Sequence, residues 1–219
     1  MPVPGSDGER YMLIPFDSLF KKYQIQAGGV LHLGANLGQE AHAYAQQGIR
    51  RVIWVEALPV IYFQLVRATV AYPGSTCLCA CVSDRDGDEV TFHVANNGGQ
   101  SSSILEFGTH LVEHPSVQYI RDEKMVTTRV DTLLKAKELS VGPDWFLNID
   151  LQGAELLALK GMGDLIHRFR YAYIEVNVKA LYQGCPMVRE IDDYLRKFGL
   201  IGRETKMTGS GWGDRFYMR

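Results

Sequence analysis

The chain has 219 residues, of which 46% are apolar and 22% charged, and its formal net charge is −2. This composition is typical of one folded, soluble domain and excludes a disordered or fibrous protein. The near-neutral charge argues against a nucleic-acid binder. Because no stretch reads as a signal peptide or a bilayer span, we expect a cytoplasmic protein without stable membrane insertion.

The first predicted element is a helix at 17–25, within an N-terminal extension of residues 1–29. From residue 30 onward, short apolar runs alternate with helical patterns. Strands are expected at 28–36, 50–57 and 75–84, and helices at 37–48 and 60–72. This alternation of continuous apolar strands with helices predicts a parallel sheet that is covered by helices on both faces.

The middle of the chain, about residues 84–130, departs from this rhythm. An Asp-Gly turn leads into an alternating stretch at 86–96, which predicts an antiparallel strand on a sheet edge. A polar loop rich in Gly and Ser follows at 96–108, and 123–139 reads as a strand that runs into a helix. This region is too short for a core of its own. We therefore expect an insertion within one domain, residues 30–219.

The alternation resumes after the insertion and ends in a hairpin. Strands are expected at 144–150 and 171–177, helices at 153–162 and 187–199, and a closing antiparallel hairpin at 200–207 and 213–219. The fold class is thus α/β, with a mostly parallel, Rossmann-like sheet.

Three cysteines alternate in the third predicted strand. Cys77, Cys79 and Cys81 would share one face of that strand. Zinc ligands favour wider spacings on loops, whereas free cysteine is a small buried hydrophobe. We therefore expect core packing and no metal.

The first strand ends in the turn Gly34-Ala35-Asn36-Leu37-Gly38. The turn lacks the G-x-G-x-x-G pattern of dinucleotide sites, and no Gly-Lys-Ser/Thr loop occurs. Glu56 ends the second strand, where a carboxylate can accept hydrogen bonds from both ribose hydroxyls. A ribose site without a diphosphate cradle fits S-adenosylmethionine, whose sulfonium is a cation.

Further polar residues end the other strands at the same edge of the sheet. Ser83 and Asp84 end the third strand, where they could read an adenine or simply form a turn. Asp150 and Gln152 follow the fourth strand, and Asp150 could instead cap the next helix. Glu175 and Asn177 end the fifth strand, and the loop at Ser101, Ser102 and Ser103 could cover this edge.

Six segments, in this order, resemble the FkbM-type family of S-adenosylmethionine-dependent methyltransferases: LHLGANLGQE, VEALPVIY, QSSSIL, TTRVDTLL, NIDLQGAELLALKGM and IEVN with LYQG. The resemblance runs from about Val30 to the C-terminus. It implies a class I methyltransferase fold with seven strands, the last antiparallel. It also implies methylation of hydroxyl oxygens on sugars, glycolipids or polyketide-type natural products.

The same resemblance implies which residues contact the cofactor: His32, Gly34, Ala35, Asn36, Gly38, Glu56, Ala57, Ser83, Asp84, Ser102, Asp150 and Gln152. In the family, the position of His32 often carries an acidic residue, which a neutral histidine does not replace as a charge. Asp150 and Gln152 would lie near the methyl group or the acceptor, and Glu56 at the ribose.

Methylation of an alcohol calls for a general base, because a hydroxyl is a poor nucleophile at neutral pH. Asp150 is the first candidate and Glu175 the second, with His32 and His93 as further ones. Asp150, Glu155 and Glu175 could also bind Mg²⁺, although Glu155 is explained as a carboxylate in the first turn of a helix.

Three other functions stay open at this stage: an N-methyltransferase, an NAD-dependent oxidoreductase, and a non-catalytic module that binds the cofactor. The absent phosphate glycines count against NAD. The expected partner is a small acceptor with a hydroxyl group, for which Tyr182, Trp212 and Ser101–Ser103 would shape a pocket. An oligomer is possible.

Overall fold

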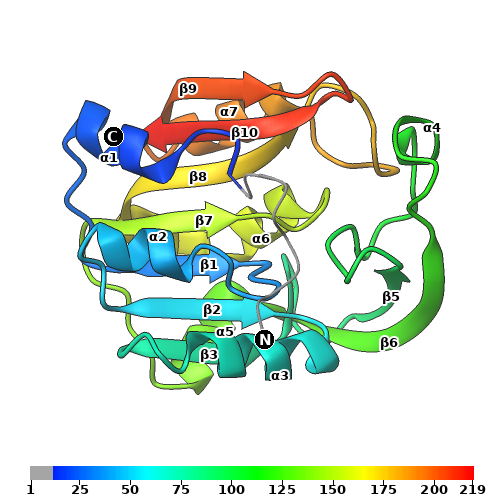
Figure 1. Cartoon of the computed structure of the whole chain (residues 1–219), viewed down its shortest axis with the longest axis horizontal. Coiled ribbons are helices and arrows are strands. Elements are labelled where there is room, and N and C mark those ends of the chain that lie inside the picture. Colours follow the sequence, from blue (N-terminus) through cyan, green and yellow to red (C-terminus); the bar gives the residue numbers. More distant parts are fainter. Residues whose placement is uncertain (1–11) are drawn as a thin grey trace.

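The computed structural model describes residues 12–219, and its main sheet has seven strands in the order β3-β2-β1-β7-β8-β10-β9 (Figure 1). The strands are β1 (Val30–Leu33), β2 (Val52–Glu56), β3 (Ser75–Cys79), β7 (Trp145–Ile149), β8 (Phe169–Asn177), β9 (Ile201–Met207) and β10 (Trp212–Met218). The first five are parallel, and β10 runs antiparallel to both β8 and β9. The predicted fold class, including the closing hairpin, is confirmed.

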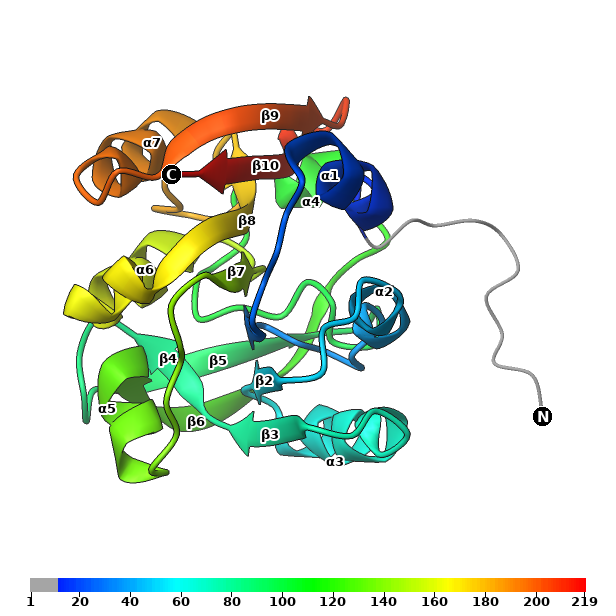
Figure 2. The same ribbon diagram turned by 90° about the vertical axis from the view of Figure 1, so that its left-hand side faces the viewer.

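Helices cover both faces of this sheet (Figure 2). One face carries α1 (Phe16–Tyr23), α2 (Ala41–Gln46) and α3 (Pro59–Thr69), and the other α5 (Val130–Ala136), α6 (Glu155–Gly161), the 3₁₀ helix η1 (Gly163–Arg168) and α7 (Val188–Arg196). Each face has its own apolar core. Leu159 and Ile191 belong to the core on the α6 and α7 side, and Tyr44 and Trp54 to the core on the α2 side.

The N-terminal extension packs into the second of these cores. The ring centroid of Phe16 in α1 lies 5.0 Å from that of Tyr44, in a tilted contact, and 4.9 Å from that of Phe146, in an edge-to-face contact. The N–H of Leu13 donates to Asp214 of β10. The extension is thereby fixed to the central strands and reaches the edge of the sheet where the parallel strands end.

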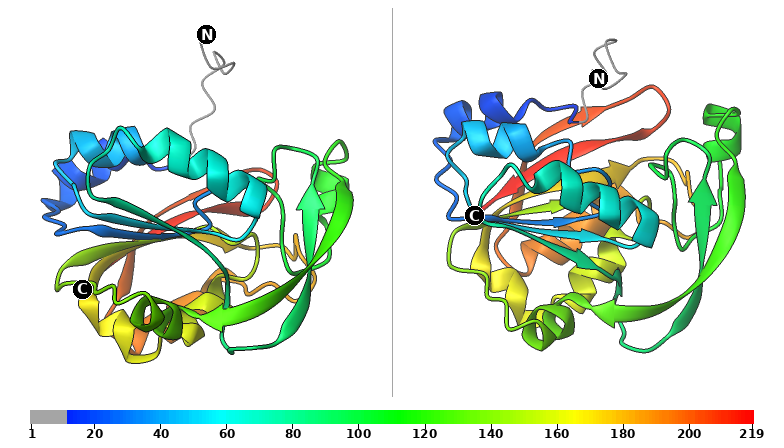
Figure 3. Two further views of the ribbon diagram at one scale, coloured as in Figure 1. Left: turned by 90° about the horizontal axis from the view of Figure 1, so that it is seen from below. Right: turned by 60° about the horizontal axis from the view of Figure 1, so that its bottom comes forward.

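The insertion forms a second, three-stranded sheet in the order β4-β6-β5 (Figure 3). Its elements are β4 (Cys81–Ser83), β5 (Glu89–Ala95), α4 (His110–Glu113) and β6 (Tyr119–Arg129). The predicted edge strand at 86–96 is therefore β5 of this separate sheet, antiparallel to β6. Phe92 and Val94 of β5 pack on Leu58, which ties the insertion to the start of α3.

The single strand predicted at 75–84 was wrong, because the chain leaves the main sheet at Ala80. The Ala80 N–H still donates to the Glu56 carbonyl, but Cys81 pairs with Thr127 of β6. The expectation that the three alternating cysteines share one buried face was also wrong. Cys79 is exposed at the end of β3 and Cys81 is buried, and all four cysteines are free thiols.

The order in which the chain adds strands to the sheet reverses between β1 and β7. The chain first adds β2 and β3 on one side of β1, and it later adds β7 and β8 on the other side. Parallel sheets bind ligands beyond the carboxyl ends of their strands at such a reversal. Among the helices of residues 12–219, none combines the length and apolarity that a bilayer crossing requires.

Candidate functional site

A cavity of about 670 Å³ lies beyond the carboxyl ends of the parallel strands. Its floor comes from the ends of β1, β2, β7 and β8, and the insertion supplies the opposite wall. Met12 and Leu13 of the N-terminal extension close one side. This volume lies within the range of pockets that hold cofactors and small substrates.

The turn after β1 passes very close to the end of β7. Gly34 has a φ of +80°, and a Cβ at this position would lie 1.7 Å from the carbonyl oxygen of Asp150. The N–H groups of Gly34 and Ala35 both donate to the carbonyl of Val55, which holds the turn against β2. Only glycine fits this backbone position, so the turn brings Gly34, Ala35 and Asn36 to the cavity surface.

Gly38, by contrast, does not line the cavity. A Cβ on it would lie 2.8 Å from Leu65 and 3.0 Å from Thr69, both on α3. Its φ of +72° also favours glycine. The second glycine of the turn therefore serves the packing of the turn against α3.

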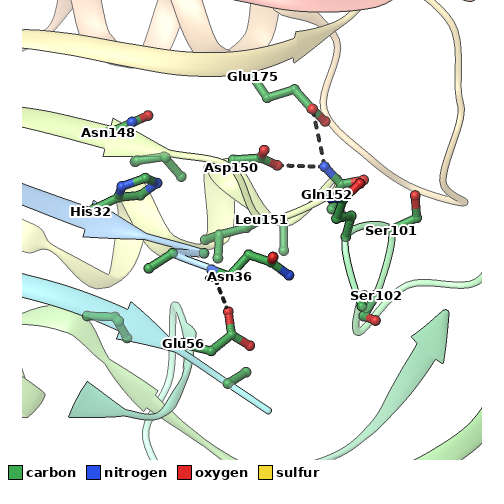
Figure 4. Close-up of a pocket in the computed structure, with 18 of the residues that line it drawn as sticks. His32, Asn36, Glu56, Ser101, Ser102, Asn148, Asp150, Leu151, Gln152 and Glu175 are labelled. Carbon is green, nitrogen blue, oxygen red and sulfur yellow. Dashed lines mark hydrogen bonds between the residues drawn. The ribbon is translucent and has the colours of Figure 1, made fainter. Parts of the chain in front are cut away.

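Glu56 ends β2 and is buried, with 7% of its surface exposed. Its Oε2 accepts the N–H of Asn36 at 2.9 Å (Figure 4). Its Oε1 accepts the N–H of Leu58 at 2.8 Å. Burial raises the pKa of this carboxyl, although the backbone donors oppose that effect. The carboxylate is thus held rigidly at the cavity wall, and each oxygen retains lone pairs for a ligand.

Two carboxyl groups on the other side of the cavity share one amide donor. Gln152 Nε2 donates to Asp150 Oδ1 at 2.6 Å and to Glu175 Oε2 at 3.2 Å (Figure 4). Asp150 projects into the cavity and is accessible there, whereas Glu175 is buried. Enclosure by the protein raises the pKa of both, and for Glu175 the Asp150 charge adds to burial.

Neighbours fix the orientation of Gln152. The hydroxyl of Tyr182 donates to Gln152 Oε1 at 2.6 Å, so the NH₂ group must face the two carboxyls. The Ser103 hydroxyl donates to the Gln152 carbonyl at 2.8 Å. Gln152 itself has a φ of +52°, which these contacts help to maintain. The insertion and the loop after β8 thereby position the donor between Asp150 and Glu175.

Glu155 forms a third acidic group next to this pair. Oxygen atoms of Asp150, Glu155 and Glu175 lie within 4.8 Å of one another. Glu155 Oε1 accepts the N–H groups of Leu151 and Gly153, as expected for a carboxylate in the first turn of α6. Burial raises the pKa of Glu155 to about 7. Three carboxyl groups of this kind could hold Mg²⁺, but two of them, Asp150 and Glu175, already accept the Gln152 amide.

His32 lies on the floor of the cavity as a buried, uncharged group. Burial lowers its pKa to about 3. Its Nδ1 lies 3.1 Å from the Tyr44 hydroxyl, which also accepts the Asn148 amide at 2.7 Å. Because that amide donates to the hydroxyl oxygen, the Tyr44 proton is free to go to His32.

Some residues expected at the site lie elsewhere. Ser83 and Asp84 do not line the cavity, because the chain enters the second sheet at Ala80 and presents Cys81 and Val82 instead. His93 also lies outside the lining, where its Nδ1 is 2.7 Å from Asp122 Oδ1. Apart from Gly38, the other expected contacts, Ala57 and Ser102 among them, do line the cavity, as do Ser101, Tyr182 and Trp212.

The structure adds cavity residues that the sequence did not single out: Glu40, His110, His114 and Asp214. Burial raises the pKa of Asp214 to about 6, and its Oδ2 accepts the Tyr173 hydroxyl. Burial lowers the pKa of His110 to about 4, and its Nδ1 has no hydrogen-bond partner. In the sequence Asp214 stands between Gly213 and Arg215, so no local pattern marked it.

Comparison with known proteins agrees with this geometry. The model of the family described as the methyltransferase FkbM domain matches residues 32–200. The 2-O-methyltransferase NoeI of Sinorhizobium fredii is 30% identical over 129 residues, which cover 56% of this chain. Those residues are 51% of NoeI, so the similarity extends over about half of that protein.

Solved structures share the architecture at low sequence identity. Magnesium protoporphyrin IX methyltransferase from Synechocystis PCC 6803, with bound S-adenosylmethionine, superimposes with a TM-score of 0.52. It is 12% identical, and the match covers 93% of this chain and 76% of that one. With bound S-adenosylhomocysteine, the same enzyme gives a TM-score of 0.51 at 13% identity and covers 93% and 80%. These similarities establish the class I methyltransferase fold.

Proposed function

The chain belongs to the FkbM methyltransferase family, and we propose that it transfers a methyl group from S-adenosylmethionine to a hydroxyl oxygen of a small acceptor. A sugar, glycolipid or polyketide-type natural product is the acceptor class that we expect. The similarity to a 2-O-methyltransferase supports an oxygen acceptor. The observation that carries the proposal is the acidic lining of the cavity.

Five carboxyl groups line the cavity: Glu40, Glu56, Asp150, Glu175 and Asp214. Among the described residues of its lining there is no lysine or arginine. A cavity lined by acidic groups without basic partners favours a cation such as a sulfonium, whose charge would keep neighbouring carboxyls ionised, and it offers no cation to the diphosphate of NAD. The five carboxyl groups therefore fit S-adenosylmethionine and count against the oxidoreductase alternative.

The two ends of the cofactor would be held by different parts of the cavity. The Glu56 carboxylate, fixed by two backbone N–H groups, is suited to accept hydrogen bonds from the ribose hydroxyls. The apolar side chains of Val82 and Phe92 offer a surface for the adenine, in place of Ser83 and Asp84. The turn residues Gly34, Ala35 and Asn36, which line the cavity, would face the methionine portion beyond the ends of β1 and β7.

When bound, the cofactor supplies a methyl group on a positively charged sulfur. We assign Asp150 as the general base that accepts the proton of the acceptor hydroxyl, because its side chain projects into the cavity and its pKa is raised. A base works best when its pKa approaches the working pH. Gln152 keeps the Asp150 side chain in place, and Glu175 shares the same donor.

The insertion and the loop after β8 form the remaining wall, which we assign to the acceptor. Ser101, His110 and His114 contribute polar groups, while Tyr182 and Trp212 contribute aromatic surface. Such a mixture suits a ring that carries several hydroxyl groups. The acceptor would thus face Asp150 from the side opposite to Glu56.

Methyl transfer from radiolabelled S-adenosylmethionine to panels of hydroxylated sugars, polyketides and amines tests the proposal. We expect labelled product with at least one hydroxyl acceptor and a loss of turnover of about 10²- to 10⁴-fold in Asp150→Asn. Transfer to amines alone would favour the N-methyltransferase alternative. Tight cofactor binding without turnover on any acceptor would favour the non-catalytic module.

A further inference from the structure

Glu40 is a cavity residue that the proposed chemistry leaves unused. It directly precedes α2, and its side chain is 12% exposed. Its Oε2 is fully buried and has no hydrogen-bond partner. A buried carboxylate oxygen without a donor is costly, and the positive charge of a ligand held against this carboxyl group in the cavity would offset the cost.

The nearest titratable group, His32, does not provide that cation. His32 Nδ1 lies 3.9 Å from Glu40 Oε2, which is too far for a hydrogen bond. As described above, His32 is uncharged, and its Nδ1 faces the Tyr44 hydroxyl at 3.1 Å. The hydrogen-bond chain from Asn148 through Tyr44 leaves Nδ1 as an acceptor, so it has no proton to offer Glu40.

The other charged groups near Glu40 are acidic. Burial raises the pKa of Glu40 to about 8, and the charges of Asp150, directly after β7, and of Asp214 in β10 add to this effect. Asp214 accepts the Leu13 N–H and the Tyr173 hydroxyl, so these donors are already used. Tyr44, on α2 itself, is uncharged, and the Glu40 charge raises its pKa further. Glu40 is thus the carboxylate of this cavity floor with the least compensation.

We propose that the Glu40 carboxylate binds the α-ammonium group of the cofactor's methionine portion. This inference rests on the proposed function. His32 stands on β1 where related methyltransferases often have an acidic residue, and Glu40 places its carboxylate within 3.9 Å of that histidine ring from the adjacent helix. The negative charge is thus supplied by the residue that directly precedes α2 instead of by β1.

Three ligands separate this contact from the rest of the cofactor site. S-adenosylhomocysteine carries the ammonium and carboxylate groups, S-adenosyl-3-thiopropylamine carries only the ammonium, and 5′-methylthioadenosine carries neither. Titration calorimetry with wild type, Glu40→Gln and Glu138→Gln compares them. Glu138 is an exposed carboxylate outside the cavity lining and provides the matched control.

We expect Glu40→Gln to weaken binding of the two ammonium ligands by about 10- to 100-fold, as for loss of a charged hydrogen bond. Its affinity for 5′-methylthioadenosine should stay within about twofold of wild type, and Glu138→Gln should match wild type throughout. Equal losses of affinity for all three ligands, or no loss for any of them, would overturn this inference and leave the proposed function standing. If wild type binds none of them, the proposed function fails and this inference with it.

Proton release provides a second readout that does not depend on turnover. Since burial keeps Glu40 protonated near neutral pH, binding of an ammonium group should release its proton. Titrations with S-adenosylhomocysteine at pH 7 in phosphate and in Tris report this proton as a difference in binding enthalpy. We expect this enthalpy difference to correspond to the release of up to one more proton in wild type than in Glu40→Gln. The same enthalpy difference in both proteins would contradict the assignment.

Discussion

Substitution of Gly34 by alanine tests the close contact between the turn after β1 and the end of β7. The new Cβ would lie 1.7 Å from the Asp150 carbonyl oxygen, which must move by about 1.3 Å to reach even a 3.0 Å contact. The Asp150 N–H donates to Leu33, so this movement strains the pairing of β1 with β7. Left-handed backbone costs about 1–2 kcal/mol for alanine, and forced overpacking adds about 1–3 kcal/mol.

Gly48→Ala is the matched control for this substitution. Gly48 has a φ of +76°, and no atom lies within 4 Å of the position of its added Cβ. The change in the unfolded chain is the same for both variants, so it cancels in the comparison. Gly48→Ala should therefore lose only the backbone cost of about 1–2 kcal/mol, and Gly34→Ala about 2–5 kcal/mol.

Thermal and urea unfolding, followed by circular dichroism, measure the two losses. For a domain of this size, about 1 kcal/mol lowers Tm by roughly 2–4 °C. We expect Tm to fall by about 2–8 °C in Gly48→Ala and clearly further in Gly34→Ala. Because Asp150 moves, Gly34→Ala should also lose affinity for S-adenosylhomocysteine below its own Tm. Equal losses of stability in the two variants would refute the reasoning about the Asp150 contact.

Three further predictions concern the carboxyl groups and their positioning. Asp150→Asn should keep its affinity for S-adenosylhomocysteine in calorimetry, and a matching loss of affinity would show a cofactor-binding role instead. Tyr182→Phe frees the Gln152 amide, so turnover should fall about tenfold while the KM for the cofactor stays constant; unchanged turnover would contradict this positioning. The folded state holds the Glu40 proton up to a pKa of about 8, above the ordinary 4.5, so this stabilisation is lost as the pH rises from about 4.5 through 8. In thermal unfolding without ligand, the Tm of Glu40→Gln minus the Tm of wild type should therefore be larger at pH 9 than at pH 5. The same difference at both pH values would argue against a buried, protonated Glu40.

The sequence predicted those features that local patterns determine. Continuous apolar runs separated by helical periods identified the parallel strands, and the Gly34 turn and Glu56 followed from their positions at strand ends. The expectation of seven strands, the last antiparallel, followed from the resemblance to a family of known architecture. Residues that follow these strands directly, such as Asp150 and Gln152, could therefore be assigned to one edge in advance.

Features that depend on contacts distant in the sequence could not be predicted in this way. The apolar pattern of 75–84 is continuous, and only pairing of Cys81 with Thr127 reveals that the chain changes sheets there. Ser83 and Asp84 were misplaced for that reason. Glu40 and Asp214 are ordinary charges in the sequence, and their burial in one cavity follows from the packing of α2 and β10 around β1 and β8.

Titration calorimetry with S-adenosylhomocysteine tests the central claim most directly, with Glu56→Ala measured alongside and NAD as the competing ligand. We predict one site per chain in wild type, no measurable binding of NAD, and an affinity about 100-fold lower in Glu56→Ala, because two charged hydrogen bonds to the ribose are lost. Unaltered affinity in a folded Glu56→Ala would contradict the assignment of the ribose site. Binding of NAD without binding of S-adenosylhomocysteine would contradict the account as a whole.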